Sequence, residues 1–205
     1  HLDPVWLWHW QRGSDEALAT CRAACDLLDD YPQATFTRGE AWVYEQVCKL
    51  DSALFRRIKK HIKNGRWEVT GGWWVQADTN IPVAESLSMT IEIGLRWFRE
   101  NMGIKEIPVA YLVDSFGHGP YLPRIIKQAG QKYFVMMRPS DAEKELPSSL
   151  FRWRSPDGYE ILTYRIVGAY LSADPDLSGK IKHILNKVPD GITHMMCFYG
   201  VGDHG

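Results

Sequence analysis

The chain has 205 residues, a length that fits one large domain or part of a larger protein. It carries 24 Lys and Arg residues against 25 Asp and Glu, and this near-neutral balance gives no electrostatic reason to bind nucleic acid or an anionic membrane. Hydrophobic residues make up 45% and charged residues 24%, which excludes wholesale disorder, and no apolar run approaches the roughly 18 residues of a membrane span.

Hydrophobic periodicity predicts an alternation of helices and strands along the chain. A first helix is expected to begin at the N-cap Ser14 and to end near Asp30. The elements that follow are a strand over 34–38, helices over 40–48 and 52–63, a strand over 66–70, a helix over 84–101, a strand over 107–113, a helix over 121–129, a strand over 132–137, a hairpin of strands 151–154 and 160–166, a helix over 177–187 and a strand over 193–199. This alternation indicates an α/β fold with a mostly parallel sheet, in which functional groups lie at the carboxyl ends of strands.

The cysteines contain no C-x-x-C pair, so we expect buried free thiols rather than a disulfide or metal framework; they are Cys21, Cys25, Cys48 and Cys197. The chain has no N-x-S/T sequon and no secretory signal before its first motif, and we therefore expect a cytoplasmic location. It begins with His rather than Met and ends in Gly-Val-Gly-Asp-His-Gly, the pattern of a sequence cut at both ends.

Acidic residues stand where predicted strands end. Asp114 follows an apolar strand in Asp-Ser-Phe-Gly-His-Gly, and Asp203 follows the last predicted strand in a glycine-rich loop. An acid directly after a buried strand gains no packing there, so a functional role for Asp114 is favoured over an Asx turn or a helix N-cap. The loop around Asp203 lacks the Lys-Ser/Thr of a P-loop, which argues against phosphate binding.

The chain opens with His1-x-Asp3, an imidazole and a carboxylate two residues apart. In an extended backbone both side chains point to one side, where they could share a Zn²⁺ or similar ion. The alternative is a surface histidine beside a turn aspartate, and spacing alone favours this alternative. No H-x-x-x-H pair occurs in the sequence, so HExxH peptidase chemistry is excluded.

Tryptophans gather near these motifs. Trp6, Trp8 and Trp10 follow the His-x-Asp pair, and Trp73 and Trp74 follow a Gly-Gly pair. An aromatic face beside carboxylates is a common way to hold a sugar ring, although core packing remains the simpler explanation for every one of these indoles except Trp6.

Four segments together resemble the zinc-dependent α-mannosidases of glycoside hydrolase family 38, in the bacterial and cytosolic branch. These segments are His1-Leu-Asp-Pro-Val-Trp6, the block from Thr70 to Pro82, Asp114-Ser-Phe-Gly-His-Gly-Pro120 and Gly200-Val-Gly-Asp-His-Gly205. They occur in the family's order and extend over the whole chain. The resemblance implies that residues 1–205 are part of a catalytic domain with a seven-stranded β/α barrel-like fold, incomplete at both ends.

The resemblance also implies roles for individual residues and one zinc ion for each catalytic site. It assigns His1, Asp3 and Asp114 as zinc ligands, with Asp114 also the catalytic nucleophile. Asp203 corresponds to the general acid/base. The residues that line the mannose site are Trp6, Phe116 and Arg138.

Two departures from the family pattern limit what the resemblance implies. The family's fourth zinc ligand is a histidine that would lie beyond residue 205, and Gln76-Ala77-Asp78 stands where related sequences often have Glu-Pro-Asp. No role is therefore assigned to Gln76, and we expect this polypeptide alone to be inactive.

The predicted activity is retaining hydrolysis of terminal α-linked mannose from glycans, with a mannose-containing oligosaccharide as the partner and with a homo-oligomer of the full-length enzyme allowed. The first alternative is a metal-dependent polysaccharide deacetylase of a related barrel, which the missing H-x-x-x-H pair disfavours. The second alternative is a carbohydrate-binding fragment without catalysis.

Overall fold

The computed structural model of the chain describes residues 1–172 and 174–200. These residues form two compact units, one from residues 1–76 and 88–107 and the other from residues 77–87 and 108–200. Each unit combines helices with a β-sheet, so the mixed α/β class is confirmed. Of the helices described, none is both long and apolar enough to cross a bilayer.

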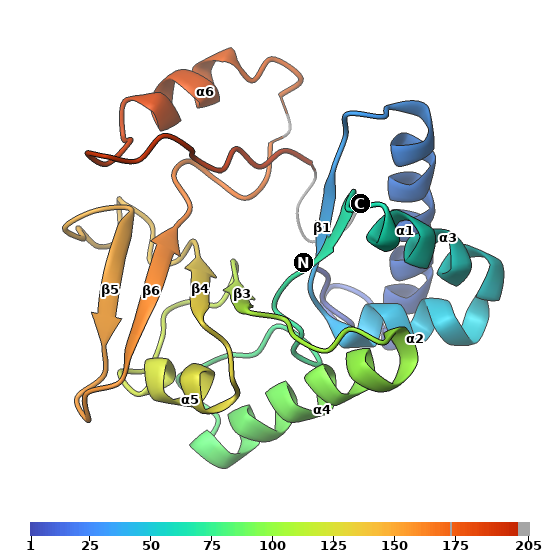
Figure 1. The fold of residues 1–205 in the computed structure, drawn as a ribbon, viewed down its shortest axis with the longest axis horizontal. Helices are drawn as coiled ribbons and strands as arrows, with labels where there is room; N and C mark the ends of the chain where they lie inside the picture. Colours follow the sequence, from blue (N-terminus) through green and yellow to red (C-terminus); the bar gives the residue numbers. More distant parts are fainter. Residues whose placement is uncertain (173, 201–205) are drawn as a thin grey trace. The chain divides into compact units, whose positions relative to one another are not determined.

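The first unit packs helices around a small parallel sheet (Figure 1). Its elements are α1 (Trp10–Asp30), β1 (Phe36–Arg38), α2 (Ala41–Leu50), α3 (Ser52–Lys63), β2 (Trp67–Val69) and most of α4 (Ala84–Met102). Strands β1 and β2 pair with Phe36 opposite Trp67, and the Phe36 and Trp67 rings lie 4.5 Å apart. The buried Tyr44 hydroxyl accepts from Trp67 Nε1 at 2.8 Å and donates to the Arg38 carbonyl at 3.1 Å, which satisfies the polar groups of this aromatic core.

Helix α1 begins earlier than its sequence pattern predicts, with His9 rather than Ser14 at the N-cap. Ser14 lies buried inside the helix, where its hydroxyl bonds the Trp10 carbonyl at 3.1 Å. Gly13 explains why the extra turn fits: a Cβ at this position would lie 2.2 Å from the Pro4 carbonyl oxygen. The segment that carries the His-x-Asp motif therefore packs directly on the first turn of α1.

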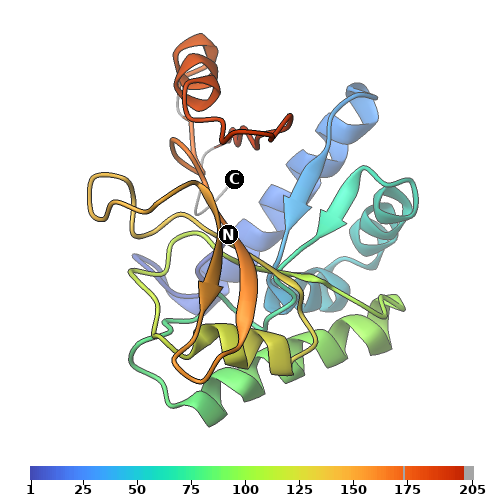
Figure 2. The same ribbon diagram turned by 60° about the vertical axis from the view of Figure 1, so that its left-hand side comes forward.

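The second unit is built on a four-stranded sheet (Figures 1 and 2). Its elements are β3 (Val109–Leu112), α5 (Leu122–Gln128), β4 (Tyr133–Met136), β5 (Leu150–Arg154), β6 (Glu160–Arg165) and α6 (Ser178–Leu185). The strand order is β3-β4-β6-β5, with β3, β4 and β6 parallel and with β5 and β6 forming the predicted antiparallel hairpin. Helix α5 packs against the sheet at β6.

Among the described residues one predicted strand is absent, and the predicted barrel is not confirmed. The strand predicted over 193–199 is wrong: this segment is irregular, and only Gly200 forms an isolated bridge, to Ser172. Within this segment the Phe198 carbonyl accepts from the side chains of Lys180 and Ser172. The sheets described have two and four strands, so a seven-stranded barrel is not confirmed. Of the cysteines predicted as buried free thiols, Cys21 and Cys25 are buried, whereas Cys48 is half-buried and Cys197 is exposed.

Candidate active site

The register of the parallel strands β3 and β4 brings a carboxylate and a guanidinium together. Leu112 of β3 lies opposite Met136 of β4, and the residues two places beyond this matched pair are Asp114 and Arg138. Arg138 Nε donates to Asp114 Oδ1 at 3.0 Å. Both side chains are about one-quarter exposed, at 25% for Asp114 and 29% for Arg138, so the pair is accessible to a substrate.

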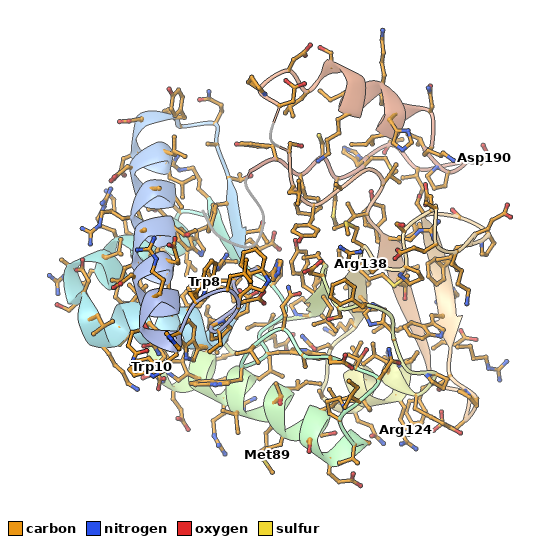
Figure 3. All side chains as sticks on the ribbon, turned by 180° about the vertical axis from the view of Figure 1, so that it is seen from behind. Trp8, Trp10, Met89, Arg124, Arg138 and Asp190 are labelled. Atoms are coloured by element: carbon orange, nitrogen blue, oxygen red, sulfur yellow. The ribbon has the colours of Figure 1, made fainter. Side chains whose placement is uncertain are left out.

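Arg138 also lies against an aromatic ring and a second carboxylate. Its guanidinium carbon lies 4.5 Å from the centre of the Phe116 ring, a cation–π distance, and its Nη1 is 3.9 Å from Glu143 Oε1. Phe116 is 74% exposed, so one large apolar ring stands open to solvent beside the Asp114–Arg138 pair. Figure 3 labels Arg138 on the stick view of the molecule. The sheet edge thus presents a carboxylate, a planar cation and an aromatic surface within one small area.

The turn after β3 is fixed by the irregular segment around residue 78. Ser115 Oγ donates to the Ala77 carbonyl at 2.8 Å, and Thr79 Oγ1 donates to the Gly117 carbonyl at 3.1 Å. The positive φ of Gly117 (111°) lets the backbone reverse here. The N-cap of α5 is Tyr121, so Asp114 does not serve as the cap of the following helix.

His118 supports the same turn from inside the unit. Its Nδ1 lies 3.0 Å from Thr79 Oγ1, and its ring packs edge-on against Phe134 at 5.2 Å and near Trp153 at 6.3 Å. Burial lowers the pKa of His118 to about 4, so the imidazole is neutral at pH 7. His118 is therefore a structural support of the Asp114 turn and not a cation at neutral pH.

His1 and Asp3 lie in the first unit as a close pair. His1 Nε2 is 3.9 Å from Asp3 Oδ1, and the His1 side chain is 1% exposed whereas that of Asp3 is 34% exposed. Two tetrahedral zinc ligands with bonds of about 2.0–2.2 Å would lie about 3.4 Å apart, so a small side-chain shift would let both bind one ion. The donor set, one imidazole nitrogen and one carboxylate oxygen, suits Zn²⁺.

The aromatic segment after Asp3 is held in place by its own contacts. Trp8 Nε1 donates to the Asp3 carbonyl at 3.1 Å, and the rings of Trp6 and Trp8 meet edge to face at 5.3 Å. Trp6 is 50% exposed, which leaves part of its ring open for stacking on a sugar, as its predicted role requires.

The structure brings some predicted site residues together and leaves others untested. Asp114, Phe116 and Arg138 form one cluster in the second unit, while His1, Asp3 and Trp6 belong to the first. Asp203 lies outside the described residues. Across residues 1–172 and 174–200, no group of three His, Cys, Asp or Glu side chains is placed to hold a metal ion, so the three-ligand zinc set stays a prediction.

Three residues of the second unit were missed from the sequence. Glu143 approaches Arg138, His118 supports the turn, and the buried Arg165 of β6 binds the loop that follows Arg138. The sequence could have indicated Arg165, because this charged residue lies inside the apolar run Tyr164-Arg-Ile-Val167. A charged side chain that is buried needs polar or charged partners.

The carboxyl ends of β3 and β4 thus carry a carboxylate, a guanidinium and an exposed aromatic ring close together. The sequence profile described as "Glycosyl hydrolases family 38 N-terminal domain" matches residues 1–205, and the chain belongs to this family.

Several proteins with similar sequences are named alpha-mannosidases. "Alpha-mannosidase G" of Dictyostelium discoideum is 30% identical over 211 residues, and "Alpha-mannosidase" of Saccharomyces cerevisiae is 27% identical over 208 residues. Both matches cover 100% of this chain, but the chain spans only 19% of the length of either relative. The solved alpha-mannosidase from Enterococcus faecalis V583 shares the fold with a TM-score of 0.74 at 16% identity, over 91% of this chain and 22% of that structure.

Proposed function

We propose that this chain forms part of the catalytic domain of a retaining α-mannosidase that removes terminal α-linked mannose from glycans. The observation that carries the proposal is the Asp114–Arg138–Phe116 cluster at the sheet edge of a family 38 chain. The fold of the complete domain in this proposal is the seven-stranded β/α barrel-like fold that the sequence resemblance implies.

In the proposed reaction Asp114 attacks the anomeric carbon of mannose as the bond to the leaving oxygen breaks, which forms a covalent glycosyl ester. Asp203 donates its proton to the leaving oxygen and later accepts a proton from the water that hydrolyses the ester, which regenerates both carboxyl groups. The bond from Arg138 to Oδ1 orients the Asp114 carboxylate for the attack.

The apolar surfaces hold the sugar in this proposal. The exposed rings of Trp6 and Phe116 offer faces on which the C–H groups of mannose can pack. His1, Asp3 and Asp114 would hold Zn²⁺, with a further ligand from elsewhere in the protein. When bound, Zn²⁺ supplies a Lewis acid for the 2- and 3-hydroxyl groups of mannose.

The test is hydrolysis of 4-nitrophenyl α-mannoside by the longest natural polypeptide that contains this chain. Asp114→Asn keeps the shape of the side chain but removes the nucleophile, and we expect kcat to fall at least about 10³-fold. The matched control is Asp190→Asn, because Asp190 is exposed on the second unit and lies far along the chain from the cluster (Figure 3). Near-normal turnover by Asp114→Asn would show that the nucleophile is wrongly assigned.

The products distinguish the alternatives. Release of α-mannose as the first anomer, followed by proton NMR, is expected for retention, whereas first release of β-mannose would indicate inversion. Release of acetate from an acetylated polysaccharide without release of mannose would favour the deacetylase. Mannoside binding without either product would favour a carbohydrate-binding role.

A further inference from the structure

The loop that starts at Arg138 is held by a second arginine that lies outside the substrate site. Arg165, the last residue of β6, is 6% exposed and stands opposite Met136 of β4 in the sheet register. Its Nη1 donates to the Lys144 carbonyl at 2.6 Å and to the Pro139 carbonyl at 3.4 Å, and its Nη2 lies 2.6 Å from Asp141 Oδ1. A buried guanidinium is stable only with such partners, so these contacts fix the loop to the sheet.

The backbone of Arg165 holds the far end of the same loop. Its N–H donates to the Ser149 carbonyl at 2.7 Å, and the next residue, Ile166, donates to the Met136 carbonyl at 2.8 Å. Both the beginning and the end of residues 139–149 are therefore attached to one position of β6. A loop of this length would otherwise be free to move relative to the strand from which Arg138 emerges.

The turn that Arg165 holds also presents Glu143 to Arg138. Glu143 Oε2 accepts from the Ser140 N–H at 2.6 Å, and the N–H groups of Glu143 and Lys144 donate to the Ser140 carbonyl at 3.1 and 2.9 Å. This closed turn places Glu143 Oε1 at 3.9 Å from Arg138 Nη1, on the guanidinium whose Nε binds Asp114. A continuous series of contacts thus joins Arg165 to Asp114 through the turn and Arg138.

We propose that Arg165 is a positioning residue, which keeps Arg138 in the orientation that aligns the Asp114 carboxylate. This inference rests on the proposed function, because it concerns the same nucleophile. Arg165 acts only through Arg138 and the loop, since its own contacts are to the Pro139 and Lys144 carbonyls and to Asp141. Its removal should lower the rate of the chemical step and leave mannoside binding largely intact.

The test compares Arg165→Met with the parent in the longest natural polypeptide that contains the chain, with 4-nitrophenyl α-mannoside as substrate. We expect kcat to fall about 10- to 100-fold with KM changed less than about threefold, because a misalignment of about 1 Å costs up to about 10²-fold in rate. The matched control is Arg154→Met, since Arg154 belongs to the same hairpin but is 71% exposed and pairs only with Glu160 at 4.0 Å among the described ion pairs. This control should stay within about twofold of the parent.

A double-mutant cycle separates positioning from general support of the fold. If Arg165 acts through Arg138, Arg165→Met should cost less than about twofold in an Arg138→Met background. The proposal is overturned if Arg165→Met alone keeps kcat within threefold of the parent. It is also overturned if the loss is equal in both backgrounds, because the effect would then bypass Arg138.

Asp141→Asn provides the same test without a buried change, since the Asp141 side chain is 45% exposed. We expect a smaller fall in kcat, of about three- to tenfold, that disappears when Arg138 is replaced by Met. An unchanged kcat in this variant would overturn the proposal even if Arg165→Met failed to fold. An inactive parent protein would instead contradict the proposed function, which keeps the two failures distinguishable.

Discussion

Asp114 and Arg138 meet because two neighbouring parallel strands end in register. The sequence predicted a functional role for Asp114 from its place after an apolar strand, whereas Arg138 entered only through the family resemblance. Residues alone could not reveal the pairing, because it depends on which residue of β3 lies opposite which residue of β4. The 3.0 Å contact confirms that Arg138 stands beside Asp114, while the catalytic roles of both residues stay predictions.

The neutral His118 makes a prediction about acid stability. Its pKa in the folded chain is about 4, because burial disfavours the charged ring, against an ordinary value of 6.5. Below pH 6.5 His118 is protonated in the unfolded chain but stays neutral in the folded chain. The free energy of unfolding therefore decreases as the pH falls from about 6.5 towards 4. At pH 5 this one group should cost about 2 kcal/mol of unfolding free energy relative to pH 7.5.

The measurement is urea unfolding of the parent and of His118→Gln at pH 7.5 and 5.0. The variant should lose about 2 kcal/mol less than the parent between these two pH values, because glutamine takes up no proton. His183→Gln is the control, since His183 is exposed on α6. Equal acid sensitivity of the parent and His118→Gln would contradict the low pKa of His118.

At the scale of elements, the sequence pattern located helices better than their ends. The apolar spacing predicted α1, but the start at Ser14 was wrong because Gly13 allows the chain to pack against Pro4 one turn earlier. Such a contact between segments leaves no mark in the local periodicity. In the segment predicted as a strand over 193–199, the side chain of Lys180 donates to the Phe198 carbonyl, a contact between segments that the local periodicity does not show either.

Helix α4 depends on a glycine in its interior. A Cβ at Gly94 would lie 2.2 Å from the Gly72 carbonyl oxygen and 2.6 Å from the Trp74 nitrogen, so the helix backbone packs directly on the segment after β2. Alanine normally stabilises a helix relative to glycine, but here the clash forces the two backbones apart. We expect Gly94→Ala to lower the unfolding free energy by about 1–3 kcal/mol or more, measured by urea unfolding.

Gly179 in α6 is the matched control for this prediction. Apart from its chain neighbours and the backbone of α6 itself, nothing lies within 4 Å of a Cβ built at Gly179, so Gly179→Ala has only the helix-propensity effect. It should leave stability unchanged or raise it by up to about 1 kcal/mol. If Gly94→Ala had the same unfolding free energy as Gly179→Ala, the segment after β2 would be able to move away from α4 with little loss of stability, which would contradict the prediction.

At the scale of the whole molecule, the sequence predicted the class of fold and the family, but the zinc site remains a hypothesis. Within the first unit, His1 and Asp3 lie 3.9 Å apart, which supports the simple i, i+2 argument for a shared ion. The other predicted ligand, Asp114, belongs to the second unit. A metal site assembled from distant parts of a chain cannot be established from spacing within one segment.

Metal removal tests this hypothesis in the longest natural polypeptide that contains the chain. Dialysis against dipicolinate should remove one zinc ion for each chain, measured by inductively coupled plasma mass spectrometry, and abolish mannoside hydrolysis; added Zn²⁺ should restore it.

A substitution tests the ligand role of His1. His1→Ala should retain less zinc after dialysis against a weak chelator, because it removes the imidazole ligand. His9→Ala should match the parent, since His9 is exposed and makes no side-chain cap bond to α1. Full activity in a protein shown to be free of metal would contradict zinc and the ligand roles of His1 and Asp3. Because the nucleophile assignment is tested separately through Asp114→Asn, that outcome would leave a glycosidase whose His1–Asp3 pair only supports the segment carrying Trp6.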